Sequence, residues 1–481
     1  MDLLERAEMR RTKMLASLDP DEQAARGQYF TPHQAARIIA SLPRVPEGAS
    51  VRVLDPGAGS GILTAAIADR LHHERPDLRI RVTVVEDDAV LHGALRETLE
   101  DVSQRTGATV RLVGRDFLRW ALSTSEKFDL VIQNPPYAKL RSSSEEQTLL
   151  RASGIVVPNM YAAFLALGLR MLSDGGQQVA ITPRSWMNGT YYSQFRHELV
   201  NAAGVDKIYT FESRSKVFKD TGVLQESIVV SMTKCHTPEY VTVFISRDHS
   251  SKSSHRTVAY DDVVTPDFIH VPATEEDAAA VTWMATHATQ SLADLGLSVS
   301  TGRVVDFRSR DMLYKDYVPG AVPMLNASHL RGGVARHPIG SKKPEWFRAD
   351  EERASKLLVP GGTYVLIKRF SAKEERRRVV AATWTSERPV AFDNKLNYIH
   401  ESGHGMNPRE ARGLWIFLNS SQLDHYFRVF SGHTQVNATD LRHMRFPSHL
   451  QLQMLGGSAA GNQESIDATV DAVLSTVEVL A

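Results

Sequence analysis

Cysteine is almost missing from this 481-residue chain, which has only Cys235. A single thiol excludes a disulfide within the chain and argues against a structural zinc site built on cysteine. Long apolar runs are missing as well: no stretch approaches the roughly 18 residues that a membrane helix needs. Residues 1–21 are charged throughout and have no apolar core, which is unlike a secretory signal. These absences predict a cytoplasmic protein with no membrane partner.

Net charge is also lacking, because 56 Lys and Arg balance 56 Asp and Glu. A neutral total does not exclude a polyanionic partner, since the local distribution of charge decides binding. Within residues 301–378, Lys and Arg clearly outnumber Asp and Glu. That excess suits nucleic-acid binding and equally suits an ordinary solvated surface. The length allows two or three domains of ordinary size.

The N-terminal half contains a strand, a glycine turn and a helix in succession. Residues 51–55 form a short apolar strand ending at Asp55, residues 56–61 read Pro-Gly-Ala-Gly-Ser-Gly, and residues 62–71 have helical periodicity. Glycines such as Gly57 and Gly59 let the backbone approach a ligand at the end of a strand. Tight turns without a ligand use the same pattern. The order predicts an α/β class and a Rossmann-like sheet.

Two further strands also end in acids. Residues 82–85 lead to Glu86 and Asp87, and residues 110–113 lead to Asp116 and Phe117. A carboxylate after the second strand can accept bonds from both ribose hydroxyls of a nucleoside, and an aromatic ring can stack on its base. Each acid alone could instead cap a helix. With Asp55 opening the glycine turn, the pattern favours a zwitterionic or cationic nucleoside such as S-adenosylmethionine over a pyrophosphate.

The fourth strand, residues 128–133, leads into Asn134–Tyr137, which reads Asn-Pro-Pro-Tyr. Consecutive prolines cannot continue a sheet ladder and hold the loop stiff. The Asn134 side-chain carbonyl and the Pro135 carbonyl can then accept both hydrogens of one amino group and favour its pyramidal form. Tyr137 offers a face on which a planar group can stack. We predict that Asn134, Pro135, Pro136 and Tyr137 form the catalytic loop, rather than a plain Pro-Pro turn.

These motifs together resemble the gamma class of DNA adenine-N6 methyltransferases, the TaqI-like group of type II restriction–modification systems. That class has a Gly-x-x-x-Thr-Pro element before the glycine loop, matched here by residues 27–32. The acidic glycine loop, the acid after the second strand, Asp-Phe and Asn-Pro-Pro-Tyr follow in the family's order. The chain departs from the pattern at Asp55, where the family often has Glu. The resemblance implies S-adenosylmethionine as the cofactor, without a metal, at a site formed by Thr31, Asp55, Gly57, Gly59, Glu86, Asp87, Asp116, Phe117 and Asn134.

The resemblance continues beyond the loop. Residues 159–164 open a helix in which Phe164 matches a phenylalanine that lies near the cofactor's adenine in the family. Phe218 precedes the strand at residues 227–232, where the family has a phenylalanine that stacks the target base against the loop tyrosine. The resemblance therefore implies a stacking role for Phe218 beside Tyr137. The alternative for Phe218 is a core aromatic at a strand edge.

The C-terminal half reads as a mixed α+β domain. We predict a catalytic domain at residues 1–240, an irregular linker at 241–290 and a DNA target-recognition domain at 291–481. Residues 365–370 and 379–383 form a predicted hairpin with a basic tip, which suits phosphate and guanine contacts. A solvated turn with internal salt bridges is the alternative. The candidate DNA-binding residues are Lys368, Arg369, Lys373, Arg376 and Arg377.

The sequence therefore predicts a site-specific methyltransferase that acts on a flipped adenine in double-stranded DNA. Cytosine-N4 methylation and protein glutamine methylation remain open, as does a DNA-binding subunit whose methylase half has decayed. A magnesium nuclease motif is not evident, since Pro266-Asp267 and Glu275-Glu276 lack the accompanying lysine. Any cognate restriction endonuclease would accordingly be a separate protein.

Overall fold

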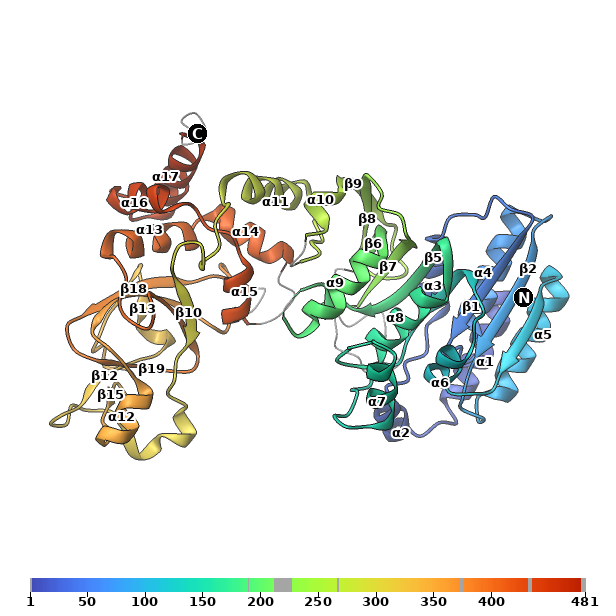
Figure 1. Cartoon of the computed structure of the whole chain (residues 1–481), viewed down its shortest axis with the longest axis horizontal. Helices are drawn as coiled ribbons and strands as arrows, with labels where there is room; N and C mark the ends of the chain where they lie inside the picture. The colour runs from blue at the N-terminus through green and yellow to red at the C-terminus, as the bar shows by residue number, and fades with distance from the viewer. Residues whose placement is uncertain are drawn as a thin grey trace. The chain divides into compact units, whose positions relative to one another are not determined.

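The computed structural model describes residues 2–188, 190–211, 227–265, 268–371, 375–430 and 435–476. The chain divides into two compact units, Met1–Ala273 and Thr274–Ala481, here called unit 1 and unit 2 (Figure 1). The division falls inside the segment 241–290 that the sequence predicted to be a linker.

Unit 1 is built on one nine-stranded sheet in the order β3-β2-β1-β4-β5-β7-β6-β8-β9. Strands β1 to β5 pair in parallel, whereas β7 is antiparallel to both β5 and β6. Because β1 lies between β2 and β4, the loops after these strands diverge at one edge, where ligands bind in open α/β sheets. The strands are β1 (Ser50–Pro56), β2 (Arg79–Val85), β3 (Thr109–Val113), β4 (Phe128–Gln133), β5 (Leu172–Pro183), β6 (Ala203–Phe211), β7 (Ser227–Lys234), β8 (Tyr240–Ser246) and β9 (Ser254–Ala259).

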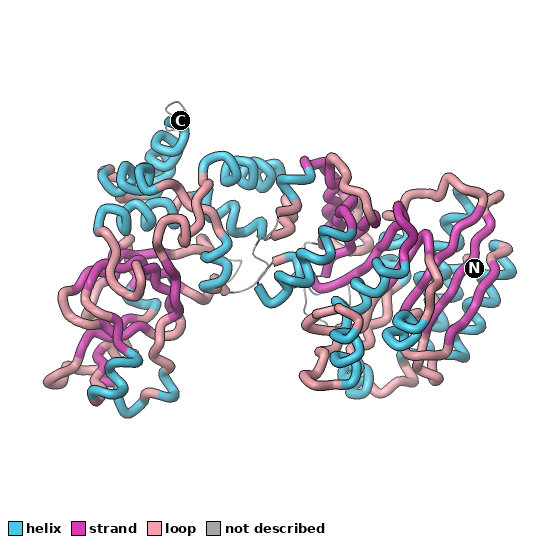
Figure 2. The backbone as a smooth tube through the Cα atoms, in the orientation of Figure 1, coloured by secondary structure: helices cyan, strands magenta, loops and turns pink. Residues whose placement is uncertain are grey.

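Helices cover both faces of this sheet (Figures 1 and 2). Buried residues alternate along the strands: in β7, Ile228 and Val230 pack into one core and Val229 into the other. Successive side chains point to opposite faces, and both faces are covered by helices. A central strand is therefore apolar at nearly every position. One face carries α1 (Leu3–Leu15), α3 (His33–Ser41), α4 (Ile62–Glu74) and α5 (His92–Thr106). The other carries α6 (Phe117–Ser123), α7 (Glu145–Ala152), α8 (Met160–Met171), α9 (Ser193–Ala202) and α10 (Tyr260–Val263).

The described part of unit 1 also has three shorter elements: α2 (Pro20–Arg26), η1 (Arg184–Met187) and η2 (Thr190–Tyr192). The Rossmann-like class, the first four strands and the helix after the glycine turn are confirmed. The expected irregularity of residues 241–290 is wrong, because β8 and β9 extend the sheet and residues 275–287 are helical. Val241, Val243 and Ile245 are buried at alternate positions, a period-two signal that the polar loop after them obscured.

Unit 2 contains two sheets and a group of helices. The six-stranded sheet has the order β10-β20-β17-β18-β14-β13, and the five-stranded sheet has the order β11-β15-β12-β19-β16. Their shared core includes Leu325, Val359, Leu366 and Phe392. The strands are β10 (Ser298–Thr301), β11 (Leu313–Tyr314), β12 (Val322–Leu325), β13 (Leu330–Arg331), β14 (Val334–Ala335), β15 (Trp346–Phe347), β16 (Leu358–Val359), β17 (Gly362–Lys368), β18 (Ala381–Ser386), β19 (Val390–Phe392) and β20 (Leu396–His400).

The helices of unit 2 follow mostly after the strands. They are α11 (Glu275–His287), α12 (Glu351–Leu357), α13 (Pro408–Leu418), α14 (Ser421–Phe430), α15 (Ala438–His443), α16 (His449–Gly457) and α17 (Gln463–Thr476), with the short turns η4 (Asp306–Arg308), η5 (Arg310–Met312) and η6 (Ala327–His329). The antiparallel pairing of β17 with β18 confirms the predicted hairpin, and the mixed α+β class is confirmed. α13 starts after its cap Asn407 and ends at Leu418.

Candidate active site

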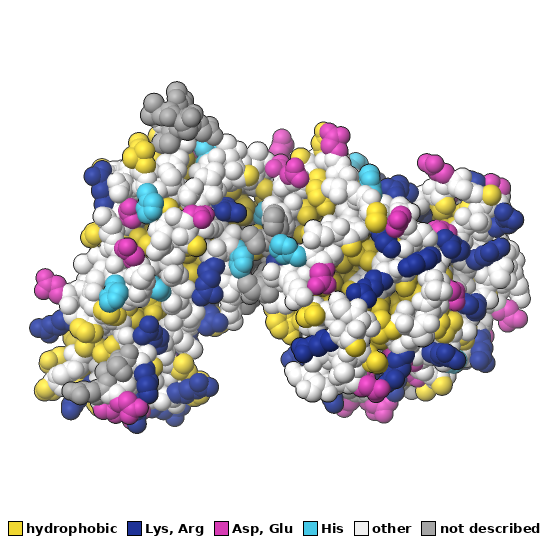
Figure 3. Space-filling model, in the orientation of Figure 1, with side chains coloured by type: hydrophobic (Ala, Val, Ile, Leu, Met, Phe, Trp, Pro, Cys, Tyr) yellow, Lys and Arg dark blue, Asp and Glu magenta, His cyan; other side chains and the backbone are white. Residues whose placement is uncertain are grey.

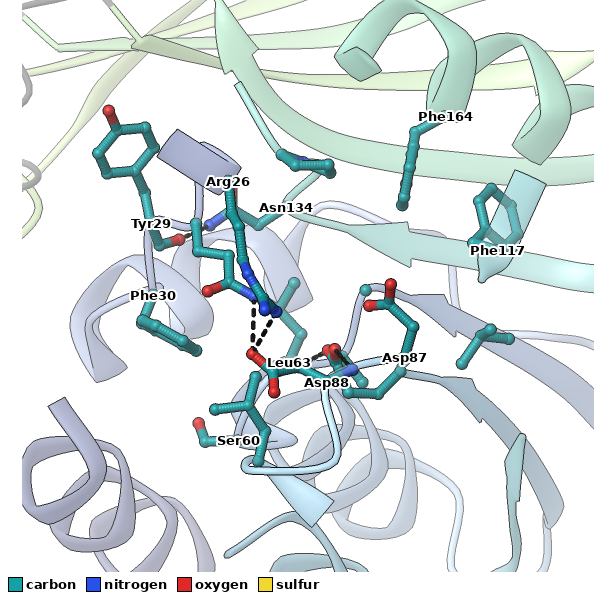
Figure 4. Close-up of a pocket in the computed structure, with 18 of the residues that line it drawn as sticks. Arg26, Tyr29, Phe30, Ser60, Leu63, Asp87, Asp88, Phe117, Asn134 and Phe164 are labelled. Atoms are coloured by element: carbon teal, nitrogen blue, oxygen red, sulfur yellow. Dashed lines mark hydrogen bonds and ion pairs between the residues drawn. The ribbon is translucent and has the colours of Figure 1, made fainter. Parts of the chain in front are cut away.

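A cavity of about 530 Å³ lies at the carboxyl ends of β1, β2, β3 and β4 (Figure 4). Nearly all residues that the sequence assigned to the cofactor line it. These are Thr31, Gly57, Gly59, Glu86, Asp87, Asp116, Phe117, Asn134 and Phe164. Asp55 is the exception, because it is buried beneath the glycine loop and does not line the cavity.

The glycine loop is shaped by left-handed backbone and by close neighbours. Gly57 and Gly59 have φ of 69° and 56°, a region that other L-residues rarely adopt. A Cβ on Gly59 would lie 3.1 Å from the Phe30 ring, and one on Gly57 would lie 3.4 Å from the Phe164 ring. The Gly57 N–H also donates to the Val85 carbonyl at 2.8 Å. The loop therefore presents bare backbone between two aromatic rings, which suits a ligand that needs close approach.

Asp55 carries an unsatisfied oxygen under this loop. Its Oδ2 accepts a 2.7 Å hydrogen bond from the Thr64 hydroxyl, whereas its Oδ1 is buried without a partner in the described part of the chain. Burial raises the pKa of Asp55 to about 7. A nearby positive group would favour the ionised form of this buried carboxyl and lower its pKa again.

The acids after β2 hold two parts of the site together. Glu86 accepts from the Gly59 N–H at 2.8 Å and from the Asp88 N–H at 3.0 Å, so each oxygen still has a lone pair for a ribose hydroxyl. Burial raises the pKa of Glu86 above its ordinary value. Asp88 accepts from Arg26 at 2.9 Å and from Gln28 at 3.4 Å, which ties the segment before Thr31 to β2 (Figure 4).

Asp116 caps a helix, the alternative that the sequence left open, and it also lines the cavity. Its Oδ1 accepts from the Arg119 N–H at 2.9 Å and caps α6, while the residue also lines the cavity. Phe117 follows it, and its ring centroid lies 4.7 Å from that of Phe164 on α8. Figure 4 shows Phe30 across the cavity from these two rings. This arrangement is suited to a planar base between aromatic walls.

Asn134 is held by the Gly-x-x-x-Thr-Pro element. Its Nδ2 donates to the Tyr29 carbonyl at 2.5 Å and to the Thr31 hydroxyl at 3.0 Å. Since a backbone carbonyl can only accept, the amide nitrogen must face Tyr29 and the side-chain oxygen must face away. That Oδ1 is buried and has no partner in the described ranges. The site therefore contains one oriented neutral acceptor that lacks a donor.

The same element supports the rest of the loop. The Tyr137 N–H donates to the Gly27 carbonyl at 3.0 Å, and a Cβ on Gly27 would lie 2.5 Å from the Ala138 nitrogen. Pro135 is buried and Pro136 lines the cavity. The Tyr137 ring is half-buried, 5.4 Å from Tyr29 and edge-on to Tyr161 at 6.1 Å. Burial raises the pKa of the Tyr137 phenol, so it stays protonated.

Sequence reasoning missed several residues that line the cavity. Arg26, Gln28 and Phe30 lie within the five positions before Thr31 in the chain, and Asp88 follows Asp87. The Gly-x-x-x-Thr-Pro element was a signal for Phe30, since that residue lies inside the motif. Nothing in the sequence indicated the contact of Arg26 with Asp88, because residues far apart in the chain form it.

The five basic candidates of unit 2 have different surroundings. Lys368 forms an ion pair with Glu375 at 2.6 Å, and Arg369 donates to the Asn394 carbonyl at 3.2 Å. Arg376 is exposed. Arg377 donates to the Ser420 carbonyl at 3.2 Å, and desolvation lowers its pKa. Lys373 and the stacking candidate Phe218 lie outside the described residues.

The described ranges contain neither a metal-ligand cluster nor a membrane-spanning helix. No group of three or more His, Cys, Asp or Glu side chains there is placed to hold a metal ion. None of the helices that the structure describes is both long and apolar enough to cross a membrane.

Comparisons with known proteins identify methyltransferases that are similar to this chain. Residues 92–218 match the family described as Eco57I restriction-modification methylase. The type II methyltransferase M.BsuBI of Bacillus subtilis is 38% identical over 92% of this chain and 91% of its own length. M.PstI of Providencia stuartii, also a type II methyltransferase, is 36% identical over 91% of this chain and 90% of its own. A shorter match, 36% identical over 23% of this chain and 44% of its own, is a tRNA1(Val) (adenine(37)-N6)-methyltransferase of Salmonella paratyphi B.

The fold of the whole chain has a solved counterpart. The type IIL restriction-modification enzyme MmeI, determined in complex with DNA, covers 99% of this chain and 74% of its own with a TM-score of 0.56 and 10% identity. That likeness concerns the fold alone, whereas the two type II relatives match this chain nearly from end to end. The chain therefore belongs to the type II DNA methyltransferases of restriction–modification systems.

Proposed function

We propose that this enzyme methylates N6 of an adenine flipped out of duplex DNA and thereby protects host DNA from a separate cognate endonuclease. The orientation of Asn134 carries the proposal. Its amide nitrogen is engaged by Tyr29 and Thr31, so its buried oxygen is the acceptor that faces a substrate. A buried acceptor without a donor costs about 1–3 kcal/mol, and an incoming amine hydrogen would remove that cost.

The chemistry required of the loop is to hold an aromatic amine. Asn134 Oδ1 would accept one amine hydrogen and the Pro135 carbonyl, held by the stiff Pro-Pro step, would accept the other. Both acceptors are neutral, so they favour a pyramidal nitrogen without removing its proton before the reaction. Tyr137 would stack on the base, with Phe218 as the second stacking candidate.

The donor set suits S-adenosylmethionine, which supplies an electrophilic methyl group when bound. Glu86 would accept from the ribose hydroxyls, and Asp116 from an adenine amine. Phe117 and Phe164 would hold the adenine ring against the glycine loop. Thr31, Gly57, Gly59 and Asp87 line the same cavity, and the negative charge of Asp55 and Glu86 favours a cationic ligand.

Adenine is favoured over cytosine by the loop itself. Cytosine-N4 enzymes more often carry Ser-Pro-Pro where this chain has Asn134, and the tRNA methyltransferase that matches part of the chain is named for adenine N6. A protein glutamine substrate is disfavoured by the second unit of the chain and by the match to DNA enzymes over both units. Base flipping follows from the position of N6, which is otherwise inside the base pair. Unit 2 would be the DNA target-recognition domain.

The test is to express the protein in a methylation-deficient host and to analyse hydrolysed DNA by mass spectrometry. We expect N6-methyladenine at one short sequence motif. N4-methylcytosine in its place, or unmodified DNA with methylated glutamine in a protein, would overturn the proposal. In purified enzyme, Asn134→Ala should abolish methylation while S-adenosylmethionine binding, measured by calorimetry, stays within about threefold of the wild type.

A further inference from the structure

Three segments of unit 2 that are distant in sequence meet at one end of its six-stranded sheet. They are residues 302–308, 369–370 and 393–396. The Asn394 N–H donates to the Val304 carbonyl at 2.8 Å, and the Arg369 N–H donates to the Lys395 carbonyl at 3.0 Å. The backbone of these segments is therefore a connected frame for the side chains that they carry.

Gly302 makes this approach feasible. A Cβ at Gly302 would lie 2.1 Å from the Asp393 carbonyl oxygen, so no other residue fits there without a backbone shift. The Gly302 N–H donates to the Leu396 carbonyl at 2.8 Å, which fixes the two segments in register. Backbone hydrogen bonds and this close backbone approach form the frame, so its shape does not depend on side-chain conformation.

Two arginines on this frame each lie over an exposed phenylalanine ring. The guanidinium carbon of Arg308 is 5.3 Å from the Phe307 ring centroid, and that of Arg369 is 5.7 Å from the Phe370 centroid. Phe307 is 67% exposed and Phe370 is 43% exposed. Each pair combines an apolar ring with a cation at the surface of the protein. This combination favours a partner that carries negative charge and also offers flat or apolar faces.

The charges on the frame favour an anionic partner. Lys395 is connected to the segments of both pairs: its Nζ pairs with Asp306 at 3.0 Å, and its carbonyl accepts from the Arg369 N–H, while its side chain stays 42% exposed. Within the described ranges, Arg308 and Arg369 form no ion pair with a carboxylate. The three segments carry four cations, Arg303, Arg308, Arg369 and Lys395, against the carboxylates of Asp306 and Asp393, of which Asp393 is buried.

We propose that Phe307, Arg308, Arg369, Phe370 and Lys395 form a surface, here called the arginine–phenylalanine surface, that binds duplex DNA. The arginines would contact phosphates or guanine edges, and the rings would pack against deoxyribose or an unstacked base. The proposal rests on the proposed role of unit 2 in target recognition and does not depend on which base is methylated.

The proposal also shifts the DNA contact away from the predicted hairpin tip. Arg377 is engaged with Ser420 and Lys368 with Glu375, so both have structural partners. Arg369 has one terminal nitrogen bound to the Asn394 carbonyl, and its guanidinium carbon lies 5.7 Å from the centroid of the Phe370 ring. In the space-filling view, most Lys and Arg visible on unit 2 lie over its sheets rather than over α13, α16 and α17 (Figure 3).

The test uses the full-length protein and fluorescence anisotropy on two duplexes, one carrying the sequence that the wild type methylates and one with that sequence scrambled. The variants are Phe307→Ala, Arg308→Ala and Arg369→Ala. Arg331→Ala is the matched control, because Arg331 is an exposed cation on β13, the opposite edge strand of the same sheet. We expect Kd for the cognate duplex to rise at least about fivefold in each surface variant and less than twofold in the control.

Two further readouts separate binding from folding and from chemistry. The slope of log Kd against the logarithm of salt concentration should decrease in Arg308→Ala by about the amount of one phosphate contact. The affinity for S-adenosylmethionine and the unfolding midpoint should stay at wild-type values. If a variant does unfold, Arg369→Lys keeps the charge but loses the planar fork, and it should lose cognate binding while retaining scrambled-duplex binding. A wild-type Kd for the cognate duplex in all surface variants would overturn the proposal that this surface binds DNA. A methylated cytosine made by a protein with an intact surface would overturn only the proposed adenine specificity.

Discussion

The hydroxyl of Thr31 accepts a 3.0 Å hydrogen bond from the side-chain nitrogen of Asn134. The sequence assigned Thr31 to the cofactor alone, and this contact gives it a second role in the catalytic loop. Together with the Tyr29 carbonyl it determines which end of the Asn134 amide faces the cavity. The segment before the first strand therefore orients the Asn134 amide as well as lining the cavity.

Removing this hydroxyl should slow methylation more than it weakens binding. A side-chain hydrogen bond of this kind is worth about 0.5–1.5 kcal/mol, so we expect Thr31→Ala to lower kcat roughly 3- to 10-fold, with a smaller change in KM for DNA. Thr31→Ser keeps the hydroxyl and should recover most of kcat. Steady-state kinetics on both variants give the result, and equal activity of Thr31→Ala and wild type would remove the orienting role.

Gly27 should tolerate no side chain. A Cβ there meets the Ala138 nitrogen and the Tyr137 backbone, so Gly27→Ala should displace the catalytic loop and lower kcat by at least about 100-fold. Gly107→Ala is the matched control: Gly107 has φ of 69°, against 64° at Gly27, and has nothing within 4 Å of the added Cβ. Both variants pay the backbone cost of about 1 kcal/mol, which thermal unfolding measures. Only Gly27→Ala should lose activity, and a similar loss in both would refute the steric explanation.

Asp55 should make the stability of the ligand-free protein depend on pH. Its pKa is raised from 3.8 to about 7 in the folded state, chiefly by burial. The folded protein thus binds more protons than the unfolded chain between these values, and this group's contribution to stability falls as pH rises through that window. We expect the unfolding midpoint of Asp55→Asn to fall less than that of wild type between pH 5 and pH 8. The difference between the two profiles should be the size expected for the titration of one carboxyl group. Parallel pH profiles for the two proteins would contradict the raised pKa.

Glu86 should be required for the shape of the cofactor cavity. Its two oxygens accept from the Gly59 and Asp88 N–H groups, and Glu86→Gln replaces one acceptor with an NH2 group that cannot accept. An unsatisfied buried N–H costs about 1–3 kcal/mol, so we expect S-adenosylmethionine affinity to fall at least about tenfold.

The control for this charge change is Glu97→Gln. Glu97 is 67% exposed and pairs with Arg10, a surface contact worth about 0–1 kcal/mol. Calorimetric titration of the cofactor into both variants should leave Glu97→Gln within about twofold of wild type. Unchanged affinity in Glu86→Gln would mean that the two backbone contacts do not shape the site.

Much of unit 1 could be predicted because its signals are local. An apolar run, a glycine turn and an acid at each strand end lie within a few residues of one another, and their period follows from strand geometry. The same reasoning failed at residues 241–290, where a polar loop hid the alternation of Val241, Val243 and Ile245. The basic candidates in unit 2 were chosen by charge alone, and charge does not reveal that Arg377 is bonded to Ser420.

The sequence by itself determined the Rossmann-like class, the order of the cofactor motifs and the loop at residues 134–137, because each depends on neighbours in the chain. Only the tertiary structure decided which way the Asn134 amide points, since Tyr29 and Thr31 lie about a hundred positions earlier. It also decided that the segments carrying Phe307, Arg369 and Lys395 meet, because strand pairing and the close approach at Gly302 bring them together. Hydrogen-bond direction and steric contact act through space, and sequence periodicity does not encode them.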